Sequence, residues 1–80
     1  MGVSMIKADQ VIDVKGLLCP KPLLMAKQAL KNLQSGQILQ VIADDITTKI
    51  TFVSFVEFSG HALLDMHLDG REIHHYIRKK

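Results

Sequence analysis

The sequence predicts an α/β fold of the α+β type. We expect a two-layer sandwich in the order β-α-β-α-β-β, with two helices on one face of a four-stranded mixed sheet. Three observations indicate it: prolines 20 and 22 follow a strand-like run, residues 37–43 are apolar on both faces, and Asp69-Gly70 separates two alternating runs. The 80 residues are expected to form one domain, residues 1–80, because this length barely suffices for a single core.

The first two elements are expected to be a strand over about residues 10–14 and a helix over about residues 20–34. At about 100° per residue, the apolar residues of the helix share one side. They are Pro22, Leu23, Met25, Ala26, Ala29, Leu30 and Leu33. Ser35-Gly36 is a suitable stop. Leu24 is the exception, because it projects into the opposite, lysine-bearing side.

The segment 48–59 has features of both a strand and a helix. Its β-branched and aromatic residues favour a strand, and they spread around a helical wheel instead of forming one stripe. However, Thr47 or Thr48 can cap a helix and Gly60 can end it, so we expect a helix. Such a helix cannot bury all three phenylalanines, so an exposed apolar patch is expected.

The C-terminal part predicts a hairpin around a two-residue turn, Asp69-Gly70. The expected pairs are Leu68 with Arg71, Met66 with Ile73 and Leu64 with His75 on one face, and His67 with Glu72, Asp65 with His74 and Leu63 with Tyr76 on the other. One face is mainly apolar and the other mainly polar, as a sheet covered on one side requires.

The strongest chemical signal is the stretch 16–22, Gly-Leu-Leu-Cys-Pro-Lys-Pro, which holds the only cysteine. Because a helix accepts proline in its first turn, Cys19 is expected at or beside the N-cap. Unsatisfied N–H groups, the helix macrodipole and Lys21 then favour a thiolate. In such settings a cysteine pKa falls from about 8.5 to roughly 3.5–7.5. We therefore expect an exposed, nucleophilic Cys19, the alternative being a small buried side chain.

Residues around the cysteine are expected to support it. Gly16, Pro20, Lys21 and Pro22 shape and charge the loop. Leu17, Leu18 and Leu24 are candidates for a small apolar patch on which a partner protein docks. The alternative for Leu24 is an isolated surface leucine without a function.

The run Asp13–Leu23 resembles the signature of the TusA/SirA/YedF family of small sulfur-carrier proteins, Cys-Pro-x-Pro after a strand ending in Asp-x-x-Gly. The similarity extends to Ser35-Gly36-Gln37, Ala43-Asp44-Asp45 and residues 60–64. It implies a helix over residues 48–59, although this chain has Ile46 where the family usually has proline and no acidic residue from there to Glu57.

The resemblance also implies that Cys19 carries a persulfide sulfur from a donor to an acceptor protein, a sulfurtransferase activity without a cofactor. A cysteine desulfurase or a rhodanese-like protein is the implied donor. tRNA thiolation, molybdenum-cofactor maturation or sulfur oxidation is the implied destination. A single cysteine suits a carrier, because a second thiol would discharge the persulfide as a disulfide.

Two other functions stay open, a small RNA-binding module and a redox regulator. Lys21, Lys27 and Lys31 slightly favour RNA, but ten basic and eight acidic residues leave a net charge of only +2, so no direct nucleic-acid binding is expected. We expect no membrane insertion, because no apolar run approaches the ~20 residues that span a bilayer. A lone cysteine and no signal-peptide pattern predict a cytoplasmic protein.

Other reactive side chains are expected to have structural roles. The spacing of the four histidines does not favour a metal site, and cross-strand polar pairing is the preferred interpretation. Asp44 and Asp45 are expected to form a turn, the alternative being an acid–base pair. The terminal Arg78-Lys79-Lys80 is expected to be a solvated tail.

Overall fold

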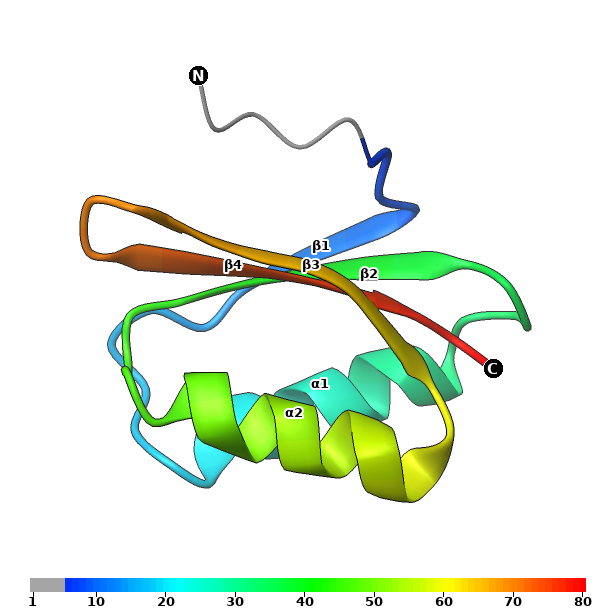
Figure 1. The fold of residues 1–80 in the computed structure, drawn as a ribbon, viewed down its shortest axis with the longest axis horizontal. Coiled ribbons are helices and arrows are strands. Elements are labelled where there is room, and N and C mark those ends of the chain that lie inside the picture. Colours follow the sequence, from blue (N-terminus) through cyan, green and yellow to red (C-terminus); the bar gives the residue numbers. More distant parts are fainter. Residues whose placement is uncertain (1–5) are drawn as a thin grey trace.

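The computed structural model describes residues 6–80 and has two layers, with both helices beneath one face of a sheet (Figure 1). In chain order the elements are β1 (Gln10–Asp13), α1 (Lys21–Lys31), β2 (Ile38–Ala43), α2 (Thr48–Ser59), β3 (Ala62–Asp69) and β4 (Glu72–Arg78). The predicted fold class and element order are confirmed. Within the described residues, no helix is long and apolar enough to cross a bilayer.

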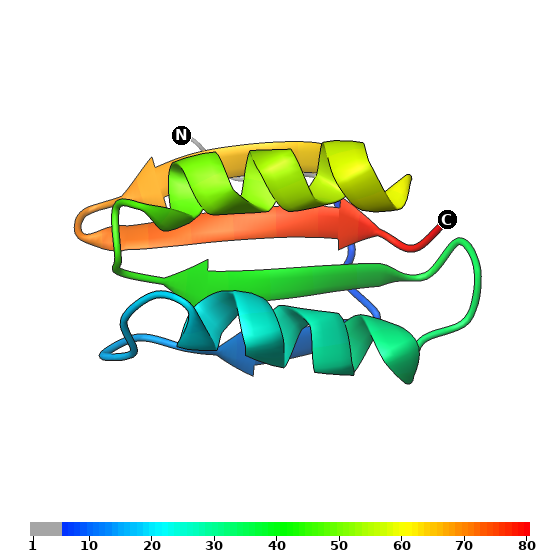
Figure 2. The ribbon, with the colours of Figure 1, turned by 90° about the horizontal axis from the view of Figure 1, so that it is seen from below.

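The strands lie in the order β1-β2-β4-β3, so β2 is an interior strand as its apolar faces predict. β1 and β2 are parallel, and the other neighbours are antiparallel. Seen from the helical side, α1 lies over β1 and β2, and α2 lies over β3 and β4 (Figure 2). Because β1 and β2 run the same way, the loops into α1 and α2 leave the sheet at the same edge (Figure 2).

The core lies between the sheet and the helices. Alternate residues of β2 are buried against it, and α1 contributes small side chains that let the helix approach the sheet closely. The buried cluster is Val14, Ala26, Ala29, Leu30, Leu39, Val41, Ala43, Phe52, Val56 and Ile77. Met25, expected on the buried side of α1, is 43% exposed, because that flank of the helix lies beyond edge strand β1.

Helix α1 is shorter at both ends than predicted. It begins at Lys21 with Pro20 as the N-cap residue, and it ends at Lys31 instead of reaching residue 34. The N–H groups of Asn32 and Leu33 bond three residues back, a tightening typical of helix ends. The Lys79 ammonium donates to the Leu33 carbonyl at 2.7 Å, so this lysine is not the solvated tail residue that we expected.

Helix α2 confirms the predicted helix over residues 48–59, but neither threonine caps it with a side chain. The Asp45 carboxylate instead accepts the Thr47 N–H at 3.0 Å. Gly60 ends the helix at φ +88° as expected, and the Lys80 ammonium donates to the Ser59 carbonyl. Phe58 is 95% exposed, so not every phenylalanine is buried.

The hairpin forms, but its turn is displaced by one residue. The two loop residues are Gly70 and Arg71, and Asp69 pairs with Glu72. Gly70 has φ +63° at the first loop position, the place that glycine takes in a type II′ turn. The observed pairs are Leu68 with Ile73, Met66 with His75, His67 with His74 and Asp65 with Tyr76. Each β3 residue thus pairs with the residue two positions beyond its expected partner on β4. A shift of two keeps every side chain on its expected face of the sheet, as far as a bulge between Leu63 and Asp65.

The helix-free face holds a polar network that includes cross-strand polar pairing, but with other partners than the expected ones. Gln40 Nε2 of β2 lies 2.9 Å from Nδ1 of His74 on β4. His67 pairs with Asp65 and His74 with Glu72, each two residues apart on its own strand. Across the strands the two imidazole rings stack at 4.9 Å between centroids. The shifted hairpin causes this difference, because it places His67 directly opposite His74.

Candidate functional site

Cys19 is exposed in the loop between β1 and α1. That loop lies at the sheet edge where both parallel strands end (Figure 2). The Lys21 N–H donates to the Leu18 carbonyl at 3.0 Å, so Cys19 and Pro20 occupy the middle of a closed turn. The peptide bond between them is cis. The thiol is therefore presented to solvent on a loop with internal hydrogen bonds.

Asp44 holds the beginning of this loop. Its Oδ1 accepts the N–H of Gly16 at 3.0 Å, across 28 positions of sequence. Gly16 has φ +84°, a conformation that residues with a side chain rarely adopt. Glycine at this position lets the chain leave β1 and turn toward α1.

Asp45 holds the cysteine itself. Its Oδ2 accepts the N–H of Cys19 at 3.0 Å, and its Oδ1 accepts the N–H of Thr47 at 3.0 Å. Hydrogen bonds from Thr47, followed by the one from Cys19, hold the pKa of this carboxyl below its usual value. One ionised carboxylate thus joins the cysteine loop to the start of α2.

The main chain of Asp45 is held from the core. The Thr48 hydroxyl donates to the Asp45 carbonyl at 2.8 Å, and it lies 3.0 Å from Nε2 of His75. Because the Thr48 hydroxyl proton is already donated to the Asp45 carbonyl, the hydroxyl oxygen accepts from His75. Nε2 of His75 therefore carries the imidazole proton and donates it to Thr48. His75 is fully buried and stacks on Phe52 at 4.4 Å, and its Nδ1 has no hydrogen-bond partner.

The electrostatics of the helix start differ from the expected pattern. Pro20 and Pro22 have no N–H, and the N–H of Lys21 closes the turn, so Leu23 carries the first N–H of α1 that is left for an anion. The cysteine loop therefore meets the positive end of the α1 macrodipole and the exposed Lys21 on one side and the negative Asp45 carboxylate on the other.

The three leucines proposed as a docking patch differ in how far they are exposed to solvent. Leu18 is 72% exposed beside the cysteine, and Leu24 is 55% exposed on α1. The Leu24 N–H bonds to the Pro20 carbonyl, which places this leucine one turn beyond the loop. Leu17 is half-buried and packs against the core, so it anchors the loop.

One group of potential metal ligands occurs within the described residues, at the hairpin. Single ligand atoms of Asp69, Glu72 and His74 lie within 4.8 Å of one another. The Lys15 ammonium already neutralises Glu72, with a nitrogen–oxygen distance of 2.7 Å. The group lies on strands β3 and β4 and does not include the cysteine loop.

The sequence predicted a turn at Asp44 and Asp45, with an acid–base pair as the alternative. The structure shows instead that both carboxylates bind backbone N–H groups of the cysteine loop. The order of the elements could have indicated this role. Asp44 and Asp45 directly follow β2, and in a parallel pair the residue after one strand lies at the same sheet edge as the loop after the other strand.

Comparison with known proteins agrees with this arrangement. Residues 10–79 match the family profile described as sulfurtransferase TusA. The chain belongs to the TusA family. The match spans the sheet, both helices and the cysteine loop.

Individual relatives support the TusA assignment. The chain is 42% identical over 72 residues, 90% of each chain, to the sulfur carrier protein TusA of Pseudomonas putida strain GB-1. It is 39% identical to sulfur carrier protein TusA of Allochromatium vinosum, covering 89% of this chain and 93% of the relative. A SirA-like protein from Desulfitobacterium hafniense has a crystal structure with TM-score 0.77 and 27% identity, covering 86% and 95% of the two chains.

Proposed function

We propose that this protein is a sulfur carrier that accepts a persulfide sulfur on Cys19 and passes it to an acceptor protein. The observation that carries the proposal is the exposed cysteine in a closed turn at the start of α1. Membership of the TusA family supports the carrier role, since relatives bear that name.

The Cys19 thiolate attacks the outer sulfur of a persulfide on the donor. A sulfur–sulfur bond forms on Cys19 while the bond within the donor persulfide breaks, and the donor cysteine leaves as a thiolate. No net oxidation occurs, because one persulfide replaces another. The α1 macrodipole and Lys21 stabilise the anion before and after transfer.

Pro20 and Pro22 restrict the loop, so less conformational entropy is lost when a partner docks. A cysteine desulfurase or a rhodanese-like protein is the proposed donor. The proposed acceptor acts in tRNA thiolation, molybdenum-cofactor maturation or sulfur oxidation. A reducing compartment such as the cytoplasm keeps the single thiol free, and we place the protein there.

The test follows radioactive sulfur from labelled cysteine through a cysteine desulfurase to this protein and then to an acceptor thiol. We expect wild-type protein to gain label and release it, and Cys19→Ser to gain none. Lys7→Ser is the matched control, since it alters an exposed residue outside the cysteine loop. Label on Cys19→Ser, or none on the wild type with several active donors, would refute the proposal.

A further inference from the structure

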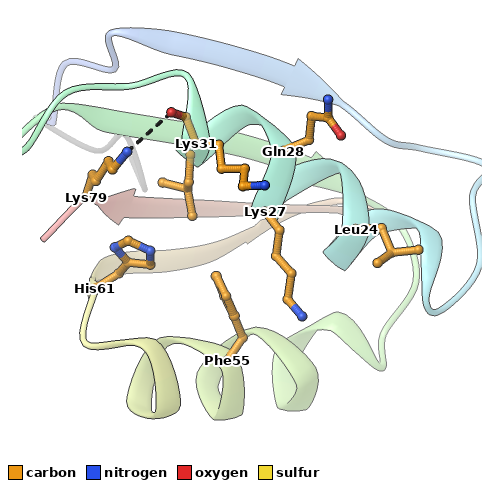
Figure 3. A pocket seen from close by; sticks show the side chains of 8 residues that line it. Leu24, Lys27, Gln28, Lys31, Phe55, His61 and Lys79 are labelled. Atoms are coloured by element: carbon orange, nitrogen blue, oxygen red, sulfur yellow. Dashed lines mark hydrogen bonds between the residues drawn. The ribbon is translucent and has the colours of Figure 1, made fainter.

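A hollow of about 570 Å³ opens between α1 and α2 (Figure 3). Its lining residues are Leu24, Lys27, Gln28, Leu30, Lys31, Phe55, His61 and Lys79. Leu24 marks one end, one turn beyond the cysteine loop, and His61 and Lys79 mark the other (Figure 3). The hollow therefore begins beside the reactive loop and extends along α1.

The lining combines an apolar floor with a cationic rim. Leu30 is a buried residue of the lining. Phe55 points from α2 toward α1 (Figure 3). On α1, residues 24, 27, 28 and 31 follow the spacing of a single helical stripe, so they face the hollow together. This stripe explains the exposed Leu24, which belongs to the apolar part of the lining.

Within residues 6–80, no ion pair joins a carboxylate to a lysine or histidine of the lining, and the cations of the observed pairs are Lys15, His67 and His74. None of the eight lining residues is acidic. The Lys27 ammonium lies 5.5 Å from the centre of the Phe55 ring, over the hollow. At the far end, burial and then the charges of Lys79 and Lys80 lower the pKa of His61.

We propose that this hollow binds an acidic segment of the protein that exchanges sulfur with Cys19. One apolar side chain of that segment lies between Leu24 and Phe55, and its carboxylates pair with Lys27 and Lys31. The identity of the partner rests on the proposed sulfur-carrier function. The binding of an acidic segment rests only on the lining residues of the hollow. The stripe on α1 is about 10 Å long, enough for roughly three extended residues.

RNA fits the same lining less well. Bases of single-stranded RNA stack on open aromatic faces. In this lining the Phe55 ring is covered by the ammonium group of Lys27, so its face is not open to a base. An apolar floor also adds little to the binding of a phosphate chain. A peptide with both an apolar and several acidic side chains uses the whole lining.

The test uses the full chain with Cys19→Ser, so that no sulfur chemistry contributes. An acetylated peptide, Glu-Glu-Leu-Glu-Glu, is titrated to millimolar concentration while amide chemical shifts are recorded. We expect shifts in α1, α2 and around His61. Lys27→Glu with Lys31→Glu should weaken binding about tenfold or more. The control pair, Lys7→Glu with Lys49→Glu, changes net charge equally outside the lining and should leave affinity within about twofold.

Several results would overturn the docking proposal. They are the absence of shifts, shifts on another face, equal weakening by the control pair, or equal binding when serine replaces the peptide leucine. Tighter binding of single-stranded RNA at the same amides would assign the hollow to RNA instead. Because Cys19→Ser carries no sulfur, failure here leaves the sulfur-transfer test unaffected, and failure of that test leaves peptide binding measurable.

Discussion

At the scale of single residues, the site depends on the Asp45 carboxylate. It accepts hydrogen bonds from Cys19 and Thr47, so the loop that presents the thiol and the start of α2 share one anchor. The hydrogen bond from the Cys19 N–H to this carboxylate fixes the turn. The same carboxylate places a negative charge beside the cysteine loop.

Asp45→Ala should loosen the cysteine loop without unfolding the protein. The substitution removes both acceptor oxygens, so the amide protons of Cys19 and Thr47 should exchange with solvent faster than in the wild type. Hydrogen exchange followed by NMR measures this. Asp69→Ala, at the hairpin, is the control and should leave both amides unchanged. Unchanged exchange at Cys19 in Asp45→Ala would show that the carboxylate is not the anchor.

The roles of Asp44 and Asp45 could not be read from local pattern. Their partners, Gly16 and Cys19, lie 28 and 26 positions earlier, and only the parallel pairing of β1 and β2 brings them together. The position of Cys19 at a helix start was predictable, because proline signals act over a few residues. The same prolines remove N–H groups, which reduces the anion stabilisation that the helix start offers.

At the scale of elements, helix ends are fixed by residues outside the helices. The Asp45 carboxylate accepts the N–H of Thr47 just before α2, while Lys79 and Lys80 donate to carbonyls at the ends of α1 and α2. Cations at helix C-termini also interact favourably with the macrodipole. The terminal lysines therefore connect the helical layer to β4.

Gly60→Ala should destabilise the end of α2. Gly60 has φ +88°, and an added Cβ would meet the Lys80 side chain at 3.1 Å. We expect the free energy of unfolding to fall by about 1–2 kcal/mol, measured by urea denaturation. Ser54→Ala, at an exposed position inside the same helix, should change it by less than about 0.5 kcal/mol. Equal stability of wild type and Gly60→Ala would contradict the role assigned to this glycine.

The hairpin shows why elements are easier to predict than register. Both possible turns place Gly70 in a two-residue loop, either second after Asp69 or first before Arg71. A type I′ turn at Asp69-Gly70 needs positive φ at both loop residues, whereas the observed type II′ turn needs it only at the first, Gly70. Local sequence therefore predicted the hairpin and its faces, but the pairing of His67 with His74 required the whole sheet.

At the scale of the whole molecule, His75 links the sheet to the helices. It lies on β4, stacks on Phe52 of α2 and donates to Thr48, which in turn holds Asp45. Burial, followed by the charge of His74, lowers the pKa of His75 to about 4. The folded state therefore keeps this histidine neutral in a range where the unfolded chain binds a proton.

This difference predicts a loss of stability in mild acid. Above about pH 6.5 both states are neutral at His75, and between pH 6.5 and 4 only the unfolded state is protonated, so the free energy of unfolding decreases as pH falls. The contribution of His75 over this range is about 3 kcal/mol. Urea denaturation at several pH values measures it. His75→Leu should flatten the curve, and an unchanged slope would contradict the assignment.

We propose above all that Cys19 carries the sulfur. The most direct test is peptide mapping by mass spectrometry after incubation with a cysteine desulfurase and cysteine. We expect one added sulfur atom on the peptide that contains Cys19, and its loss when an acceptor thiol is added. Sulfur found on other peptides, or a Cys19 peptide that stays unmodified beside an active donor, would contradict it.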